Sequence, residues 1–155
     1  MQDNDDGEER EGSWRKLLLS GGALLGVAAA YNAFARKGVD HITNLIGGEE
    51  GGFEWRDRRV AFTKRGKGPP ILLIHGIHAA AWSYEWRNNA EALARNNTVY
   101  TLDLLGFGMS DRPAIRYSAR LYISLISDFV SRVIDEPTVL VASSLSAAYA
   151  IVLAA

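Results

Sequence analysis

The chain has 155 residues, the length of one domain, and 48% of them are hydrophobic, which is enough for a packed core. Its formal net charge of −1 gives no basis for nucleic-acid binding. The absence of cysteine excludes disulfides, thiolate metal sites and a cysteine nucleophile. The histidines lack the spacing of metal ligands on a helix, so we expect no metal and no cofactor; they are His41, His75 and His78.

The N-terminal segment differs in composition from the rest of the chain. Residues 1–12 hold six acidic side chains against one arginine, which predicts a disordered acidic tail over residues 1–16. Residues 17–35 carry no charge, and a helix of that length would span about 29 Å, close to the hydrocarbon thickness of a bilayer. We therefore predict a hydrophobic helix over 17–37 that anchors the protein to a membrane. A cleaved export signal, or a helix packed on a cytoplasmic protein, is the alternative.

The next part of the chain predicts a linker and a hairpin. Residues 38–52 include four glycines near their end and are interpreted as a linker, so that the folded domain occupies residues 53–155. Segments 53–56 and 59–65 surround a polar turn and predict two antiparallel strands. The unbroken apolar run Ile71–Ile74 is typical of a strand that is buried on both faces.

Helices and strands then alternate. We expect a helix within 83–97, a strand over 98–103, a helix over 117–133 with a 3.6-residue apolar stripe, and a strand that begins at Thr138. This alternation predicts an α/β fold in which a mostly parallel sheet is flanked by helices.

The segment that follows Thr138 indicates a nucleophile. An apolar run ends at small residues, a serine follows, and a helix-like stretch begins, which is the outline of a strand–turn–helix elbow. The residues two before and two after the nucleophile must be small because strand and helix approach closely there. Ala142 and Ser146 occupy these positions around Ser144, where glycine is usual.

Two other interpretations of this segment stay open. Ser146 also has small residues two before and two after it, although Ser144 lies at the better distance from the end of the apolar run. The serines could also simply cap a helix that follows a buried strand.

Three motifs together resemble the α/β-hydrolase superfamily. They are His75-Gly76 after one strand, Asp103-x-x-Gly-x-Gly-x-Ser-Asp-x-Pro113 after the next, and the elbow around Ser144. The resemblance covers residues 53–155 and is nearest to the esterase and pheophytinase-like branch. It implies that Ser144 is the nucleophile of a hydrolase acting on a carboxylic ester or related acyl bond.

The resemblance also implies the surroundings of that serine. The backbone N–H groups of Ile77 and Leu145 would form the oxyanion hole. His75 would shape the oxyanion loop, and Asp103 would organise the loop that follows its strand. Nearby side chains would form a pocket for a small apolar substrate; those expected there are Trp82, His78 and Phe107.

The family's order along the chain is serine, acid, histidine, and no histidine follows Ser144. We therefore expect this chain to be the N-terminal part of a longer protein and to be inactive alone. Two alternatives keep the fold: a membrane-tethered, non-catalytic binding or scaffold protein, if Ala142 and Ser146 crowd the elbow, and a cofactor-free lyase or haloperoxidase.

Overall fold

The computed structural model describes residues 43–155. The predicted acidic tail (1–16), the predicted hydrophobic helix (17–37) and the first part of the predicted linker lie outside the described residues, as does His41. Within the described part of the chain, none of the helices has the length and hydropathy needed to cross a bilayer.

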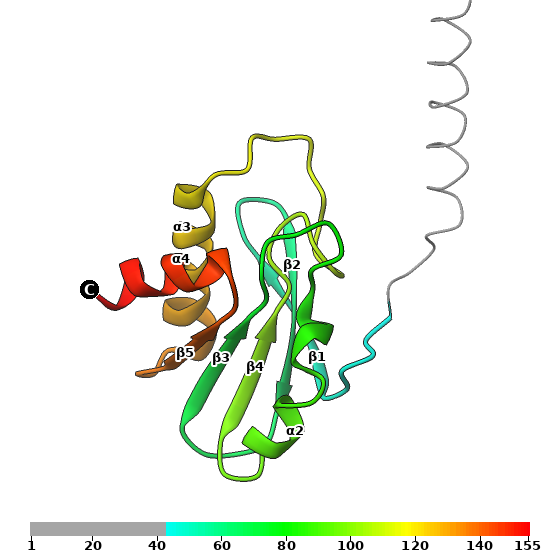
Figure 1. The fold of residues 1–155 in the computed structure, drawn as a ribbon, viewed down its shortest axis with the longest axis vertical. Helices are drawn as coiled ribbons and strands as arrows, with labels where there is room; N and C mark the ends of the chain where they lie inside the picture. Colours follow the sequence, from blue (N-terminus) through cyan, green and yellow to red (C-terminus); the bar gives the residue numbers. More distant parts are fainter. Residues whose placement is uncertain (1–42) are drawn as a thin grey trace, which may run out of the picture. The chain divides into compact units, whose positions relative to one another are not determined.

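A five-stranded mixed sheet forms the centre of the fold (Figure 1). Its spatial order is β1-β2-β4-β3-β5, and the strands are β1 (Glu49–Glu54), β2 (Arg59–Arg65), β3 (Pro70–Ile74), β4 (Thr98–Leu102) and β5 (Val139–Ala142). Strand β2 pairs antiparallel with both β1 and β4, whereas β3 pairs parallel with β4 and β5. The α/β prediction is confirmed, but the parallel part is confined to β3, β4 and β5.

The first strand starts earlier than the sequence indicates. β1 begins at Glu49, so the predicted 38–52 linker ends before that residue. The glycines have a packing role there: Gly51 pairs with Phe62, and a Cβ on Gly51 would lie 2.1 Å from Cζ of the Phe62 ring. An exposed, glycine-rich strand lacks the alternating apolar pattern by which strands are found in a sequence.

Helical segments lie between the parallel strands and after the last of them. They are the 3₁₀ turn η1 (Ser83–Trp86), α2 (Ala90–Leu93), α3 (Ala119–Phe129), its π-type continuation η2 (Val130–Ile134) and α4 (Leu145–Ala154). The side chain of Ser118 caps α3 by accepting the N–H of Leu121. The single helix expected within 83–97 is replaced by two short segments, η1 and α2.

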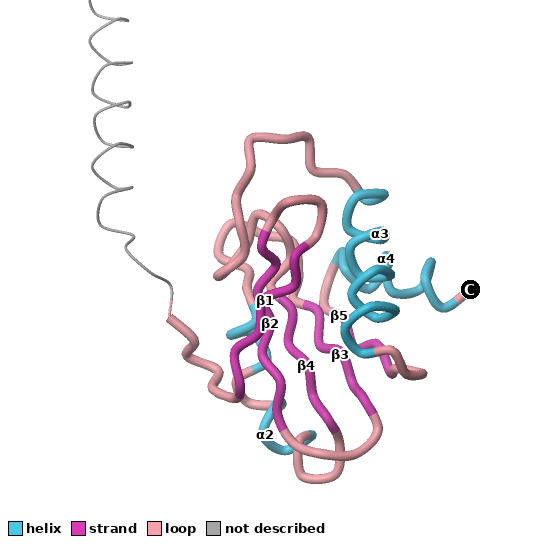
Figure 2. Tube along the Cα trace, turned by 180° about the vertical axis from the view of Figure 1, so that it is seen from behind, coloured by secondary structure: helices cyan, strands magenta, loops and turns pink. Residues whose placement is uncertain are grey.

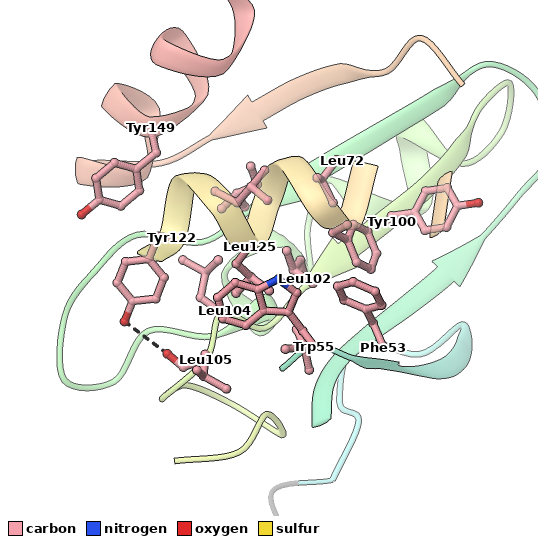
Figure 3. Close-up of a cluster of buried hydrophobic side chains, with 14 of the residues drawn as sticks. Phe53, Trp55, Leu72, Tyr100, Leu102, Leu104, Leu105, Tyr122, Leu125 and Tyr149 are labelled. Atoms are coloured by element: carbon pink, nitrogen blue, oxygen red, sulfur yellow. Dashed lines mark hydrogen bonds between the residues drawn. The ribbon is translucent and has the colours of Figure 1, made fainter. Parts of the chain in front are cut away.

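The two faces of the sheet bury different side chains. Along β3, Leu72 and Ile74 pack on the side of α3 and α4, whereas Ile71 and Leu73 pack with Ala90 of α2. Figure 2 shows α3 and α4 together beside β5. In Figure 3 Leu125 of α3 lies among Leu72, Leu102 and aromatic rings of the larger core. The unbroken apolar run of β3 is thus explained by burial on both faces.

The far edge of β5 and the outer side of α4 expose apolar surface. Val139 is 59% exposed and Ile151 69% exposed, and β5 is an edge strand of the sheet. Because an unpaired edge beside apolar side chains promotes strand pairing between molecules, we expect the segment 43–155 to self-associate.

Sedimentation velocity tests this expectation. Lysine at Val139 or Ile151 should shift the protein toward monomer, whereas Asn88→Lys, at an exposed site on another surface, should not. Exposed edges commonly associate at concentrations up to about 100 μM. A wild-type segment that stays monomeric over this range would show that this surface does not mediate self-association.

Candidate active site

The turn between β5 and α4 holds Ser144 in an unusual backbone conformation. Its φ is 54° and its ψ −131°, a region that non-glycine residues rarely occupy and that costs roughly 1–3 kcal/mol. The backbone N–H of Ser143 donates to the carbonyl of Ile74 at 3.1 Å, which ties the turn to the end of β3. Ser144 is exposed, and its side chain makes no capping hydrogen bond to α4. A serine that only capped the helix would need neither the strain nor the exposure.

Ser146 has a different environment. It is fully buried, and its hydroxyl donates to the carbonyl of His75 at 2.7 Å. Ala142 lies within the ladder opposite Ile74. Both positions that usually hold glycine are therefore filled while the turn keeps its form, and the Ser146 hydroxyl is occupied by a structural hydrogen bond.

The loop after β3 packs against the turn. Gly76 is buried, and a Cβ at that position would lie 3.2 Å from Cβ of Ser144, which explains why a residue without a side chain stands here. Within residues 43–155, neither the N–H of Ile77 nor that of Leu145 donates a hydrogen bond. These two groups flank Ser144 on the loop and on the first turn of α4, where a helix N-terminus favours negative charge.

His75 connects the ends of β3 and β4. It is fully buried, and its Nε2 accepts the N–H of Leu104 at 3.0 Å, so the ring proton lies on Nδ1 and donates to the carbonyl of Gly76 at 2.7 Å. Burial lowers the pKa of this imidazole, against the opposing effect of the Gly76 hydrogen bond. With both nitrogens engaged, His75 supports the loop and has no lone pair left to act as a base.

Asp103 organises the loops beside the site. Its carboxylate is buried and accepts the N–H of Ser83 at 2.7 Å and the N–H of Met109 at 2.8 Å, while its carbonyl accepts the hydroxyl of Ser110. Both carboxylate oxygens are therefore used by backbone donors. Within residues 43–155, no group of three or more acidic or histidine side chains is placed to hold a metal ion.

An apolar cavity of about 360 Å³ adjoins the turn. Its walls include Ile77, Leu145, Phe107 and three tyrosines, namely Tyr117, Tyr122 and Tyr149. Two other residues expected in the pocket do not line this cavity: His78 is exposed on the loop, and Trp82 stacks on Tyr84 at 5.4 Å. A larger cavity, about 490 Å³, lies between α3, β5 and α4 and is lined by none of the predicted site residues.

One carboxylate beside Ser144 was not indicated by the sequence. Glu85 of η1 accepts the N–H of Gly76 at 2.8 Å, and its Oε2 lies 3.7 Å from the place that a Gly76 Cβ would occupy. The only sequence signal was an acidic residue between two aromatic ones, and its partners are distant along the chain.

Comparison with known proteins identifies the family of this chain. The family model described as "Alpha/beta hydrolase family" matches residues 71–155, from β3 through the turn and α4. The chain belongs to this family. A 2-hydroxy-6-oxo-6-(2'-aminophenyl)hexa-2,4-dienoic acid hydrolase from Metapseudomonas resinovorans is 41% identical over 81 residues, which are 52% of this chain and 26% of that protein.

Other relatives of this α/β hydrolase chain differ in chemistry. A soluble epoxide hydrolase from a Corynebacterium species is 37% identical over 73 residues, 47% of this chain and 25% of the relative. Among solved structures, a meta-cleavage product hydrolase from Pseudomonas fluorescens superposes with a TM-score of 0.64 at 27% identity, covering 72% of this chain and 41% of the other. The chain spans about a quarter of the length of these curated relatives. The shared property is hydrolysis on this fold.

Proposed function

We propose that the chain carries the nucleophile and oxyanion hole of a serine hydrolase that cleaves a carboxylic ester or related acyl bond. The observation that supports this most strongly is the exposed Ser144 in a strained turn at the start of α4. Strain at a serine without a capping role is typical of a nucleophile that is held for reaction.

The proposed reaction proceeds in two steps. The Ser144 oxygen attacks the carbonyl carbon while its proton passes to a base, and the N–H groups of Ile77 and Leu145 stabilise the oxyanion. The intermediate then expels the alcohol, which takes the proton, and leaves an acyl-serine. Water, activated by the same base, hydrolyses the acyl-serine. The family order places the acid and base after Ser144.

The cavity beside the turn supports a small apolar substrate. Ile77 and Leu145 contribute both the proposed donors and part of the cavity wall, so an acyl group whose oxygen is held by these donors can place its substituent against Phe107. A volume of about 360 Å³ is at the low end of ligand pockets. We infer an apolar acyl group with the dimensions of a phenyl ring or a short alkyl chain.

Pre-steady-state hydrolysis of p-nitrophenyl esters tests the proposal. The protein made from the intact gene should release about one equivalent of nitrophenol in a burst before steady turnover, because an activated aryl ester acylates the serine faster than the acyl-serine is hydrolysed. The 155-residue chain alone should stay close to background. An intact protein that hydrolyses no ester would contradict ester hydrolysis and favour the non-catalytic scaffold protein, unless the acid described in the next paragraph is turned over.

A second candidate is hydrolysis of a dienoic acid of the kind named for the Metapseudomonas resinovorans relative. The 41% identity to that relative, over a segment that overlaps the family match, favours it. Turnover of such an acid without turnover of neutral esters would select this reaction in place of ester hydrolysis.

We also propose that residues 17–35 attach the protein to a membrane, since they form an uncharged run between basic residues. After fractionation, the intact protein should stay in the pellet through a carbonate wash, and deletion of residues 1–42 should release it. A full-length, uncleaved chain in the soluble fraction would exclude the anchor.

A further inference from the structure

Glu85 lies between the two segments that hold the proposed oxyanion donors. One is the loop Gly76–Ile77, and Glu85 accepts the N–H of Gly76 at 2.8 Å. The other is the turn that contains Ser144, where the side chain of Ser143 lies near the same carboxylate and acts to lower its pKa. A Cβ placed on Gly76 would lie within 4 Å of Ser143 Oγ, Ser144 Cβ and Glu85 Oε2, so all these groups meet at one point.

The carboxylate is ionised in this setting. Partial burial acts to raise the pKa of Glu85, but the nearby Ser143 side chain, the N–H of Gly76, His75 and His78 outweigh burial and leave the pKa below its usual value. An ionised carboxylate accepts hydrogen bonds only, and such charge-assisted bonds are about twice as strong as neutral ones. At neutral pH, the Glu85 carboxylate therefore holds the loop through the N–H of Gly76 while it lies beside Ser143 of the turn.

A role for Glu85 within its own segment does not account for these contacts. Its hydrogen-bond partner Gly76 lies on the loop after β3 and its neighbour Ser143 on the turn after β5, and no hydrogen bond from its side chain to η1 is present within residues 43–155. A role as general base is also disfavoured, because Oε2 already accepts the N–H of Gly76 and the lowered pKa makes the carboxylate a weaker base.

We propose that Glu85 is a positioning residue that fixes the spacing of the Ile77 and Leu145 N–H groups around the Ser144 oxyanion. This inference rests on the proposed function. Misplacing an oxyanion donor affects the transition state more than substrate binding, because the full negative charge on the oxygen forms only during reaction.

Steady-state kinetics of Glu85 variants of the intact protein provide the test. Glu85→Ala should lower kcat by about 10- to 100-fold, somewhat less than removing a donor outright, with KM changed by less than about threefold. Glu85→Gln keeps a carbonyl oxygen for the Gly76 N–H and should recover most of the lost rate. In the Glu85→Ala background, Ser143→Ala should cause no further loss, because the contact is already broken.

A second measurement reports the contact without using turnover. In NMR spectra of the ¹⁵N-labelled protein, the Gly76 amide should titrate with an apparent pKa below that of an ordinary glutamate, and Glu85→Gln should abolish that titration. If the wild type forms the acyl-serine and Glu85→Ala has the same kcat, the inference about Glu85 is overturned and the proposed function still stands. A wild type with no acyl-serine chemistry would overturn the proposed function and the catalytic role of Glu85 with it.

Discussion

Replacement of Ser144 by alanine is expected to lower ester turnover of the intact protein by at least about 10⁴-fold, since it removes the group that forms the acyl intermediate in the proposed mechanism. Among residues 43–155, Ser144 is the elbow serine that combines exposure with a positive φ. The fold should survive, because the exposed hydroxyl makes no capping hydrogen bond whose loss would weaken α4. Equal melting temperatures for the variant and the wild type would attribute the loss to chemistry.

Ser146→Ala is the matched control for this prediction. It removes the buried hydrogen bond to the His75 carbonyl, which should cost about 1 kcal/mol of stability, but it leaves the nucleophile in place. We expect its turnover to stay within about tenfold of wild type, because the oxyanion loop loses one support. Activity that survives Ser144→Ala and disappears with Ser146→Ala would show that the nucleophile is Ser146.

Gly108→Ala should have the largest effect on stability, a loss of more than about 3 kcal/mol. Gly108 has φ of 50°, and a Cβ there would lie 2.2 Å from the carboxyl carbon of Asp103. Asp103 is buried and holds the N–H groups of Ser83 and Met109, so it cannot move away without breaking those bonds. Urea unfolding of the intact protein measures the difference.

Gly52→Ala is the control for this stability effect. Gly52 is exposed and has no positive φ, and the three atoms nearest to a Cβ there, from 3.1 Å outward, all belong to the flexible side chain of Arg59. Its free energy of unfolding should stay within about 0.5 kcal/mol of wild type. Equal stability of the two alanine variants would mean that Asp103 does not constrain this loop.

The parts of the fold that sequence patterns predicted are those whose pattern reflects local burial. The apolar run of β3 is unbroken because both faces of the strand contact the core, and α3 has an apolar stripe because one face of the helix does. The start of β1 was missed because its glycines make room for Phe62, a contact set by the partner strand. The helix expected within 83–97 is broken into two, where Ser83 and Glu85 are bound by Asp103 and Gly76.

In the candidate site, too, the features set by local sequence could be predicted and those set by distant contacts could not. Small residues around Ser144 are a local requirement of the turn and could be read from the sequence. The contribution of Glu85 depends on partners 9 and 58 positions away along the chain, and no periodic pattern signals such contacts. The environment of Trp82, which stacks on Tyr84 and does not line the cavity, likewise depends on the tertiary fold.

The most direct test of the central proposal is to map the adduct of a fluorophosphonate on the intact protein by peptide sequencing in a mass spectrometer. The account predicts one adduct per chain, with the fragment ions placing it on Ser144 and leaving Ser143 and Ser146 unmodified. No adduct on the folded protein, or an adduct on either neighbouring serine, would contradict it.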